Sequence, residues 1–345
     1  MPKPPDQIFL LQISDPHIGT SLMPARDTYR SGPRAGYNPH EHRLLVPLEN
    51  AIRDARKLSQ MPPEHDLPVV ISGDLTQSGL ENDYATALAI FHERWQWRYG
   101  ANSRWIGFAW PREQMMMVPG NHDHWRHKTH QTAYSRGLSP DWFEPTPWRR
   151  TLQSTQGGFS LELFGVDSNS GLEDPTARPG KKNLFARGLI SDYELSTLEA
   201  MLQETTPGPE RIRTLVCHHA FSTAGGFLSA KPLEAESRSA LVALAARHGV
   251  AVVLTGHTHS FHEQDWQQDP NDDGSWVLKE LRCATTLQAK KRKEAGLQGF
   301  RFHRIARSEN GGTEWTAWKY QVGAKFFTVE KGNPVSFQVP SLPSP

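Results

Sequence analysis

Short apolar runs recur along the chain and alternate with amphipathic stretches. Six runs have the length of buried strands and end at Gly, Asp, Asn or His: Ile8–Ser14, Leu67–Ser72, Gln114–Pro119, Phe159–Val166, Arg213–Cys217 and Val250–Thr255. Their Val, Ile, Leu, Phe and Met residues do not alternate strictly with polar ones, which is typical of strands covered on both faces.

Helical patterns lie between several of these strands, at Glu41–Leu58, Ser191–Leu202 and Ser237–His248. The first pattern carries apolar residues on one face at three- and four-residue spacing. The second opens with a capping box formed by Ser191 and Glu194, and the third ends at Gly249. Strands that alternate with helices predict an α/β layered fold.

The pattern changes after Phe261, where strands follow one another without an intervening helix. They are expected at Ser275–Thr286, Gly299–Ala306 and Glu314–Tyr320, with polar turns between them, so this part is predicted to be antiparallel β structure. We therefore expect a single domain over residues 1–332, with insertions at Thr20–His40 and Phe91–Pro111. A tail rich in Pro and Ser, residues 333–345, is expected to run over the surface.

Metal-ligating side chains follow five of the predicted strands, at the point where each strand ends. The motifs are Asp15-Pro16-His17, Gly73-Asp74, Gly120-Asn121-His122-Asp123, His218-His219 and Gly256-His257-Thr258-His259. In extended backbone, residues two apart face the same side, so each D-x-H or H-x-H pair is expected to point one way. Ligands of open α/β sheets bind beyond the carboxyl ends of the strands, so we expect the motifs to meet at one edge of one sheet.

The residue types at these strand ends indicate a metal site. Imidazole, carboxylate and amide ligands suit Zn, Mn, Fe or Co, and the absence of cysteine from the motifs argues against a structural zinc site. The candidate ligands are too many for one ion. They suit two ions about 3.5–4 Å apart, the arrangement used for in-line displacement at phosphorus.

The motif order D-x-H, G-D, G-N-H-D, H and G-H-x-H resembles the calcineurin-like metallophosphoesterase superfamily. It is especially similar to the class III branch of cyclic-nucleotide and glycerophosphodiester phosphodiesterases. The resemblance implies a four-layer αββα sandwich with two divalent or trivalent metal ions at the C-terminal ends of the strands. The chain departs from that branch after His218-His219, where Ala220-Phe221 stands in place of prolines. The long spacing between Asp15 and Asp74 also departs from the pattern and is consistent with the insertion at Thr20–His40.

The same resemblance implies a role for each motif residue. The first ion would be held by Asp15, His17, Asp74 and His259, and the second by Asp74, Asn121, His218 and His257. His122 would contact the phosphate or act as the acid, and Asp123 is a candidate to orient it. His218 is preferred to His219 because it is the first residue after the strand Arg213–Cys217, but the choice stays open.

These residues together predict a metal-dependent phosphoric ester hydrolase, with a phosphodiesterase favoured. A hydroxide that bridges the two ions is expected to attack phosphorus in line with the leaving alkoxide. Three alternatives stay open. A phosphomonoesterase could use Arg26, Arg30 and Arg34 of the first insertion; a nuclease could use the basic run Lys290–Lys293 and the Trp-rich insertion; and a non-catalytic scaffold would bind metal without turnover.

Composition limits the partners and the compartment. A formal net charge of +1 argues against a polyanion binder, so a small phosphodiester is the expected substrate; nucleic acid is not favoured and a homo-oligomer stays open. Two cysteines exclude a disulfide scaffold and suggest a reducing compartment. No stretch reads as a signal peptide or a membrane span, so we expect a cytoplasmic protein that does not contact membranes.

Overall fold

The computed structural model describes residues 5–19, 45–58, 61, 67–77, 79, 81–99, 102–124, 143–173, 187–223, 231–267, 276–287, 299–308, 311–322, 329–331 and 333–339. The predicted insertion at Thr20–His40, with its arginines, lies outside these residues. The basic run Lys290–Lys293 does too.

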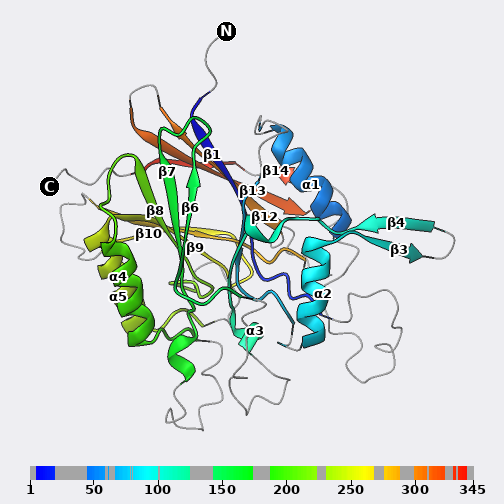
Figure 1. The fold of residues 1–345 in the computed structure, drawn as a ribbon, viewed down its shortest axis with the longest axis horizontal. Helices are drawn as coiled ribbons and strands as arrows, with labels where there is room; N and C mark the ends of the chain where they lie inside the picture. The colour runs from blue at the N-terminus through cyan, green and yellow to red at the C-terminus, as the bar shows by residue number, and fades with distance from the viewer. Residues whose placement is uncertain are drawn as a thin grey trace.

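Two mixed sheets stack face to face (Figure 1). The first sheet has the order β14-β13-β12-β1-β2-β5, with β15 also paired to β13. Its strands are β1 (Gln7–Ile13), β2 (Val69–Ser72), β5 (Met115–Val118), β12 (Gly299–Arg307), β13 (Thr313–Val322), β14 (Val329–Lys331) and β15 (Val335–Gln338). Strands β1, β2 and β5 are parallel, whereas β12 and β13 extend the sheet antiparallel.

The second sheet has the order β10-β11-β9-β8-β7-β6. Its strands are β6 (Trp148–Gln153), β7 (Ser160–Gly165), β8 (Arg211–Val216), β9 (Val250–Thr255), β10 (His262–Trp266) and β11 (Leu278–Arg282). Strands β7, β8, β9 and β11 are parallel, and β6 and β10 are antiparallel edges. The sequence predicted antiparallel β structure throughout the part after Phe261. This prediction is wrong for β11, which is parallel to β9.

Helices cover the outer face of each sheet, with α1 and α2 on one side of the molecule and α4 and α5 on the other (Figure 1). The helical elements are α1 (Leu45–Leu58), α2 (Glu81–His92), α3 (Asn121–His124), α4 (Asp192–Gln203) and α5 (Ala235–His248), with short 3-10 turns at Arg112–Gln114 and Ser170–Glu173. A separate hairpin, β3 (Trp95–Tyr99) and β4 (Asn102–Ile106), follows α2. Within the described residues, no helix is both long and apolar enough to cross a membrane.

The buried side chains form three clusters that correspond to the three interfaces between these four layers. One cluster joins α1 and α2 to the first sheet, one joins the two sheets, and one joins the second sheet to α4 and α5. Along β1, Ile8 and Leu10 enter the inter-sheet cluster while Phe9, Leu11 and Ile13 face the helices. The expected αββα sandwich, with strands buried on both faces, is confirmed.

Most helix ends lie where the capping residues in the sequence predicted them. Oγ of Ser191 accepts a hydrogen bond from the Glu194 amide at the start of α4, and Gly249 ends α5 with φ 63°. Helix α2, strands β6 and β10, and the β3–β4 hairpin within the predicted insertion were not anticipated. Within the expected surface tail, residues 335–338 form β15, which pairs with β13 and is exposed or only partly buried.

A buried polar chain also joins the two sheets. Nε1 of Trp315 donates to Nδ1 of His303 at 3.1 Å, and Nε2 of His303 lies 3.2 Å from Oε1 of Gln12. Nε2 of Gln12 in turn donates across the interface to the carbonyl of Thr255 at 3.1 Å. Burial and the charge of Arg301 lower the pKa of His303 well below its usual value, so the ring is neutral in the folded protein.

This burial predicts an acid-dependent loss of stability. Below about pH 6.5 the unfolded chain takes up a proton that folded His303 does not, so the free energy of unfolding should fall as the pH decreases, by about 1 kcal/mol between pH 7 and 5.5. His303→Gln should remove that part of the slope in urea denaturation. If the free energy of unfolding depends on pH in the same way in both proteins, His303 is not the cause of the acid-dependent loss.

Candidate metal centre

Five turns bring the predicted ligands to one edge of the molecule, where the carboxyl ends of both sheets meet. From the first sheet, β1 leads to Asp15 and His17, β2 to Asp74 and β5 to Asn121. From the second sheet, β8 leads to His218 and β9 to His257 and His259. The expectation of one edge of one sheet is therefore corrected, because two stacked sheets contribute.

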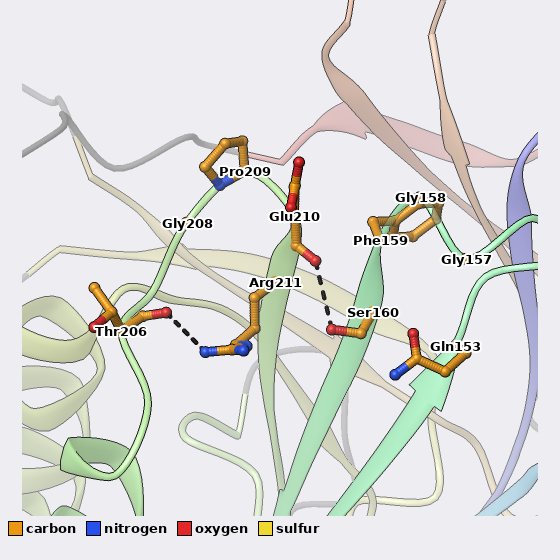
Figure 2. A pocket seen from close by; sticks show the side chains of 10 residues that line it. All are labelled: Gln153, Gly157, Gly158, Phe159, Ser160, Thr206, Gly208, Pro209, Glu210 and Arg211. Atoms are coloured by element: carbon orange, nitrogen blue, oxygen red, sulfur yellow. Dashed lines mark hydrogen bonds between the residues drawn. The ribbon is translucent and has the colours of Figure 1, made fainter.

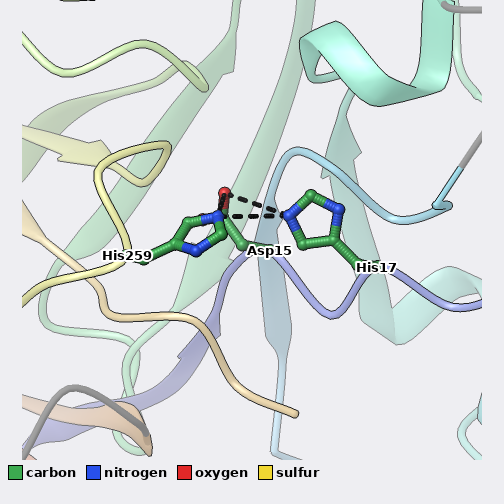
Figure 3. Close-up of side chains that lie close together, drawn as sticks. All are labelled: Asp15, His17 and His259. Carbon is green, nitrogen blue, oxygen red and sulfur yellow. Dashed lines mark hydrogen bonds and ion pairs between the residues drawn. The ribbon is translucent and has the colours of Figure 1, made fainter. Parts of the chain in front are cut away.

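The first group of ligand atoms comes from Asp15, His17 and His259 (Figure 3). Nε2 of His17 lies 3.2 Å from Nε2 of His259, which lies 3.3 Å from Oδ1 of Asp15. One ligand atom of each residue lies within 4.8 Å of the other two. Both rings turn a nitrogen toward the same carboxylate, as ligands around a shared cation would.

The second group comes from Asp74, His218 and His257. Nε2 of His218 lies 3.2 Å from Nδ1 of His257 and 3.1 Å from Oδ1 of Asn121, which places the amide oxygen in this group. Oδ2 of Asp74 lies 3.4 Å from Nε2 of His218 and 3.5 Å from Nε2 of His17. Asp74 therefore stands between the two groups at nearly equal distances.

The ligand turns are not the extended backbone that the two-residue spacing suggested. Asp15, His17, Asp74, His257 and His259 have φ values of 48°, 46°, 51°, 68° and 55°, in the left-handed region. Asp and His are among the non-glycine residues that adopt this conformation most often, although it remains strained. Tight left-handed turns, rather than strand alternation, direct these side chains to the centre.

His219 lies outside both groups. Its Nδ1 is 2.7 Å from Oγ of Ser168, while the adjacent His218 reaches Asp74 and Asn121. The geometry therefore brings His218, rather than His219, to the ligand set.

His122 is half-buried beside the first group. Its backbone amide donates to Oδ1 of Asp74 at 2.7 Å, and its Nδ1 lies 2.9 Å from the carbonyl of Gln77. The ring meets the ring of His17 edge-on, with centroids 4.5 Å apart. A ring nitrogen of His122 also lies within 4.8 Å of ligand atoms of His17 and Asp74, so the residue borders the centre.

Asp123 is fully buried and fastens two ligand turns together. Its carboxylate accepts hydrogen bonds from the backbone amides of Leu75, Thr76 and Gly120 at 2.8–3.0 Å. Burial, with the charge of Asp74 adding to it, raises the pKa of Asp123 to about 6. These contacts give Asp123 the role of joining the Asp74 and Asn121 turns, and its expected role in orienting His122 stays a prediction.

The charges of the centre suit a bound cation. Burial alone would raise the pKa of Asp74, but His218, His122 and His17 hold it well below its usual value. Burial alone would lower the pKa of His218, but Asp74 and Asp15 raise it to about 9. At neutral pH the metal-free cluster therefore holds a proton on His218, which a metal ion would displace. The imidazole, carboxylate and amide donors fit Zn, Mn, Fe or Co.

A family model described as calcineurin-like phosphoesterase matches residues 10–261, a span that contains every residue of the two groups. The chain belongs to this family. Membership supports a metal-dependent phosphoric ester hydrolase, and it confirms the resemblance to the calcineurin-like superfamily drawn from the motif order. No match was found among curated proteins.

Several solved structures are similar to this chain at low sequence identity, and the first of the three that follow has a TM-score high enough to show a shared fold. GAP50, the anchor in the inner membrane complex of Plasmodium, is 11% identical with a TM-score of 0.52, over 97% of this chain and 89% of that one. A phosphatase from Mycoplasma pneumoniae is 9% identical with a TM-score of 0.37, over 98% and 96% of the two chains. Vps29 of Entamoeba histolytica, solved with Zn²⁺, is 10% identical with a TM-score of 0.31, over 95% and 99%. The last two scores are too low for a comparison of sites.

Sequence reasoning missed a polar layer next to this phosphoesterase centre. His124, which belongs to none of the predicted ligand motifs, is buried with Nε2 3.2 Å from Oδ2 of Asp167. Asp167 and Ser168 directly follow the predicted strand Phe159–Val166, which contains β7 and is the one predicted strand without a ligand motif after it. The polar residues after that strand were the signal that could have revealed the layer.

A pocket of about 430 Å³ lies at the opposite edge of the second sheet, where β7 and β8 begin (Figure 2). Its polar groups satisfy one another, since Ser160 donates to the carbonyl of Glu210 and Arg211 donates to that of Thr206. It lies away from every ligand of the phosphoesterase centre and supplies none of its chemistry.

The ligand turns pack so closely that one methyl group added at Gly120 should disturb them. A Cβ atom at Gly120 would lie 2.2 Å from Oδ1 of Asp74 and 2.3 Å from its backbone nitrogen. Gly120→Ala should therefore displace Asp74, lower the free energy of unfolding by roughly 1–3 kcal/mol and reduce the metal content. Gly208→Ala is the matched control, because a Cβ there meets nothing within 4 Å. Denaturation and elemental analysis of both variants test this, and equal results for the two would contradict it.

Proposed function

We propose that the chain is a dinuclear metal-dependent phosphodiesterase that hydrolyses small phosphodiesters. The observation that carries the proposal is the position of Asp74, whose Oδ2 is 3.5 Å from His17 and 3.4 Å from His218, one from each ligand group. A carboxylate in that position suits a bridge between two neighbouring ions. The dinuclear arrangement is common for displacement at phosphorus.

Each ion has a proposed set of ligands. Asp15, His17, Asp74 and His259 would hold the first, and Asp74, Asn121, His218 and His257 the second. When bound, the ions would lower the pKa of a water molecule toward neutrality and offset negative charge on the phosphoryl oxygens.

His122 is proposed as the group that helps the leaving oxygen depart. The hydrogen bond between its Nδ1 and the carbonyl of Gln77 fixes the orientation of the ring beside the first ligand group. A histidine held in this way can donate a proton to a leaving alkoxide or stabilise a phosphoryl oxygen. Asp123 would act on the reaction only through the turns that it joins.

The diester preference rests on charge. The centre consists of imidazoles, carboxylates and one amide, and the chain has a formal net charge of only +1. A dianionic monoester would require more cationic groups than a singly charged diester. The similarity of the motifs to the class III phosphodiesterase branch favours the same substrate class.

The dinuclear proposal predicts two equivalents of metal per chain after reconstitution, measured by elemental analysis. Asp74→Ala should reduce the occupancy of both positions, because both groups use this carboxylate. Asp265→Ala is the control, since Asp265 is exposed and pairs with Lys279 on β11. A wild-type content that stays at one equivalent would rule out the dinuclear centre.

The substrate proposal predicts that bis(p-nitrophenyl) phosphate is cleaved with a higher kcat/KM than p-nitrophenyl phosphate when both are assayed with the same metal. A purified-enzyme screen over monoesters, linear diesters, cyclic nucleotides and short RNA extends the comparison. A preference reversed by tenfold or more would indicate a phosphomonoesterase. No hydrolysis with both metals bound would indicate a scaffold.

The role of His122 predicts a loss that depends on the leaving group. His122→Ala should retain both metals but lose about 10²–10⁴-fold in rate on alkyl diesters, and much less on p-nitrophenyl esters, whose leaving group needs little protonation. His248→Ala, at the end of α5, is the control. Loss of a metal ion, or a kcat within about threefold of wild type on alkyl diesters, would refute this role.

A further inference from the structure

An ion pair is buried on β11, beyond the residues that the family model matches. The side chains of Arg282 and Glu280 are both fully buried, and Nη2 of Arg282 lies 3.3 Å from Oε1 of Glu280. The residues are two apart on the strand, so both side chains point to the same face of the sheet. Because both charges are removed from water, such a pair contributes little stability by itself. Its other hydrogen bonds therefore indicate its role.

The pair holds the turn that carries His257 and His259. Nη1 of Arg282 donates to Oγ1 of Thr258 at 3.2 Å, and Oε1 of Glu280 accepts from Oγ1 of Thr255 at 2.8 Å. Thr258 is buried and stands between the two histidines. The left-handed backbone of both histidines needs support from its surroundings, and these bonds supply it from within the protein.

The same pair holds the segment that follows His218. Nη2 of Arg282 donates to Oγ of Ser222 at 3.1 Å, and Oε1 of Glu280 accepts from the backbone amide of Phe221 at 3.1 Å. The other carboxylate oxygen accepts from Nε1 of Trp266 at 3.1 Å. One ion pair therefore binds both segments of the second sheet that carry metal-ligand histidines.

We propose that Arg282 and Glu280 are positioning residues for the metal centre and that the Thr258 hydroxyl transmits their hold to His257 and His259. The inference rests on the proposed metal site. The pair fixes the distance between the His218 segment and the His257–His259 turn, so the three imidazoles are held in place before metal arrives. Supporting bonds of this kind commonly affect metal affinity by 10–100-fold.

The test uses variants that leave the ion pair intact, because removing one buried charge alone endangers folding. Thr258→Val keeps the shape of the side chain but removes the acceptor for Arg282, whereas Thr258→Ser keeps a hydroxyl. Ser237→Ala is the matched structural control, since Ser237 lies on α5 and its buried hydroxyl accepts from the backbone amide of Ile190, in a segment that carries no proposed ligand. All are made in the full chain.

Metal binding is measured by calorimetry, with Mn²⁺ or Zn²⁺ alone added to metal-free protein. We expect Thr258→Val to weaken binding 10–100-fold and Thr258→Ser to stay within about threefold of wild type. Ser237→Ala should lower the Tm but leave the affinity unchanged. In metal-free Thr258→Val, hydrogen exchange should also accelerate at the Gly256 amide, which in wild type donates to the carbonyl of His218 at 3.0 Å.

The outcomes separate this inference from the proposed function. If the wild type binds two ions and Thr258→Val binds them equally well, the positioning role is overturned. The phosphodiesterase proposal would still stand. If Ser237→Ala loses as much metal affinity as Thr258→Val, the loss reflects lower overall stability. The positioning role is overturned in that case too. Wild type that binds no metal would overturn both.

Discussion

The packing of the two sheets against each other is the constraint on which the rest of the structure depends. Neither of the two proposed ligand sets is complete within one sheet, because Asp15 and His17 of the first sheet need His259 of the second, and Asp74 needs His218 and His257. The inter-sheet cluster and the chain from Trp315 through His303 and Gln12 to the carbonyl of Thr255 fix this relation. Thr255 directly precedes the turn of His257, so the contact that joins the sheets also locates a ligand.

Polar groups buried around the centre share this task of alignment. Asp123 joins two turns of the first sheet, and the Arg282–Glu280 pair joins two segments of the second. Their hydrogen bonds convert flexible turns into fixed positions, which is what a site made from distant parts of the chain requires.

Much of the fold and of the ligand set could be predicted from the sequence because the informative residues are local. Buried strands are short apolar runs, helix ends carry caps such as Ser191 and Gly249, and each ligand motif directly follows a strand. What could not be predicted depends on contacts between distant residues. The division of strands between two sheets and the pairing of β11 with β9 leave no local pattern. The role of Asp123 in joining two turns could not be predicted for the same reason, since its partners include residues of another turn.

The left-handed backbone at five of the seven ligand positions couples chemistry to chain geometry. A residue at these positions must both coordinate and tolerate a positive φ, which Asp and His do better than glutamate or a β-branched residue would. Glycine would relax the backbone there while abolishing the ligand. Such replacements would trade catalysis for a more stable protein, so the centre is a place where natural selection for activity and for stability would favour different amino acids.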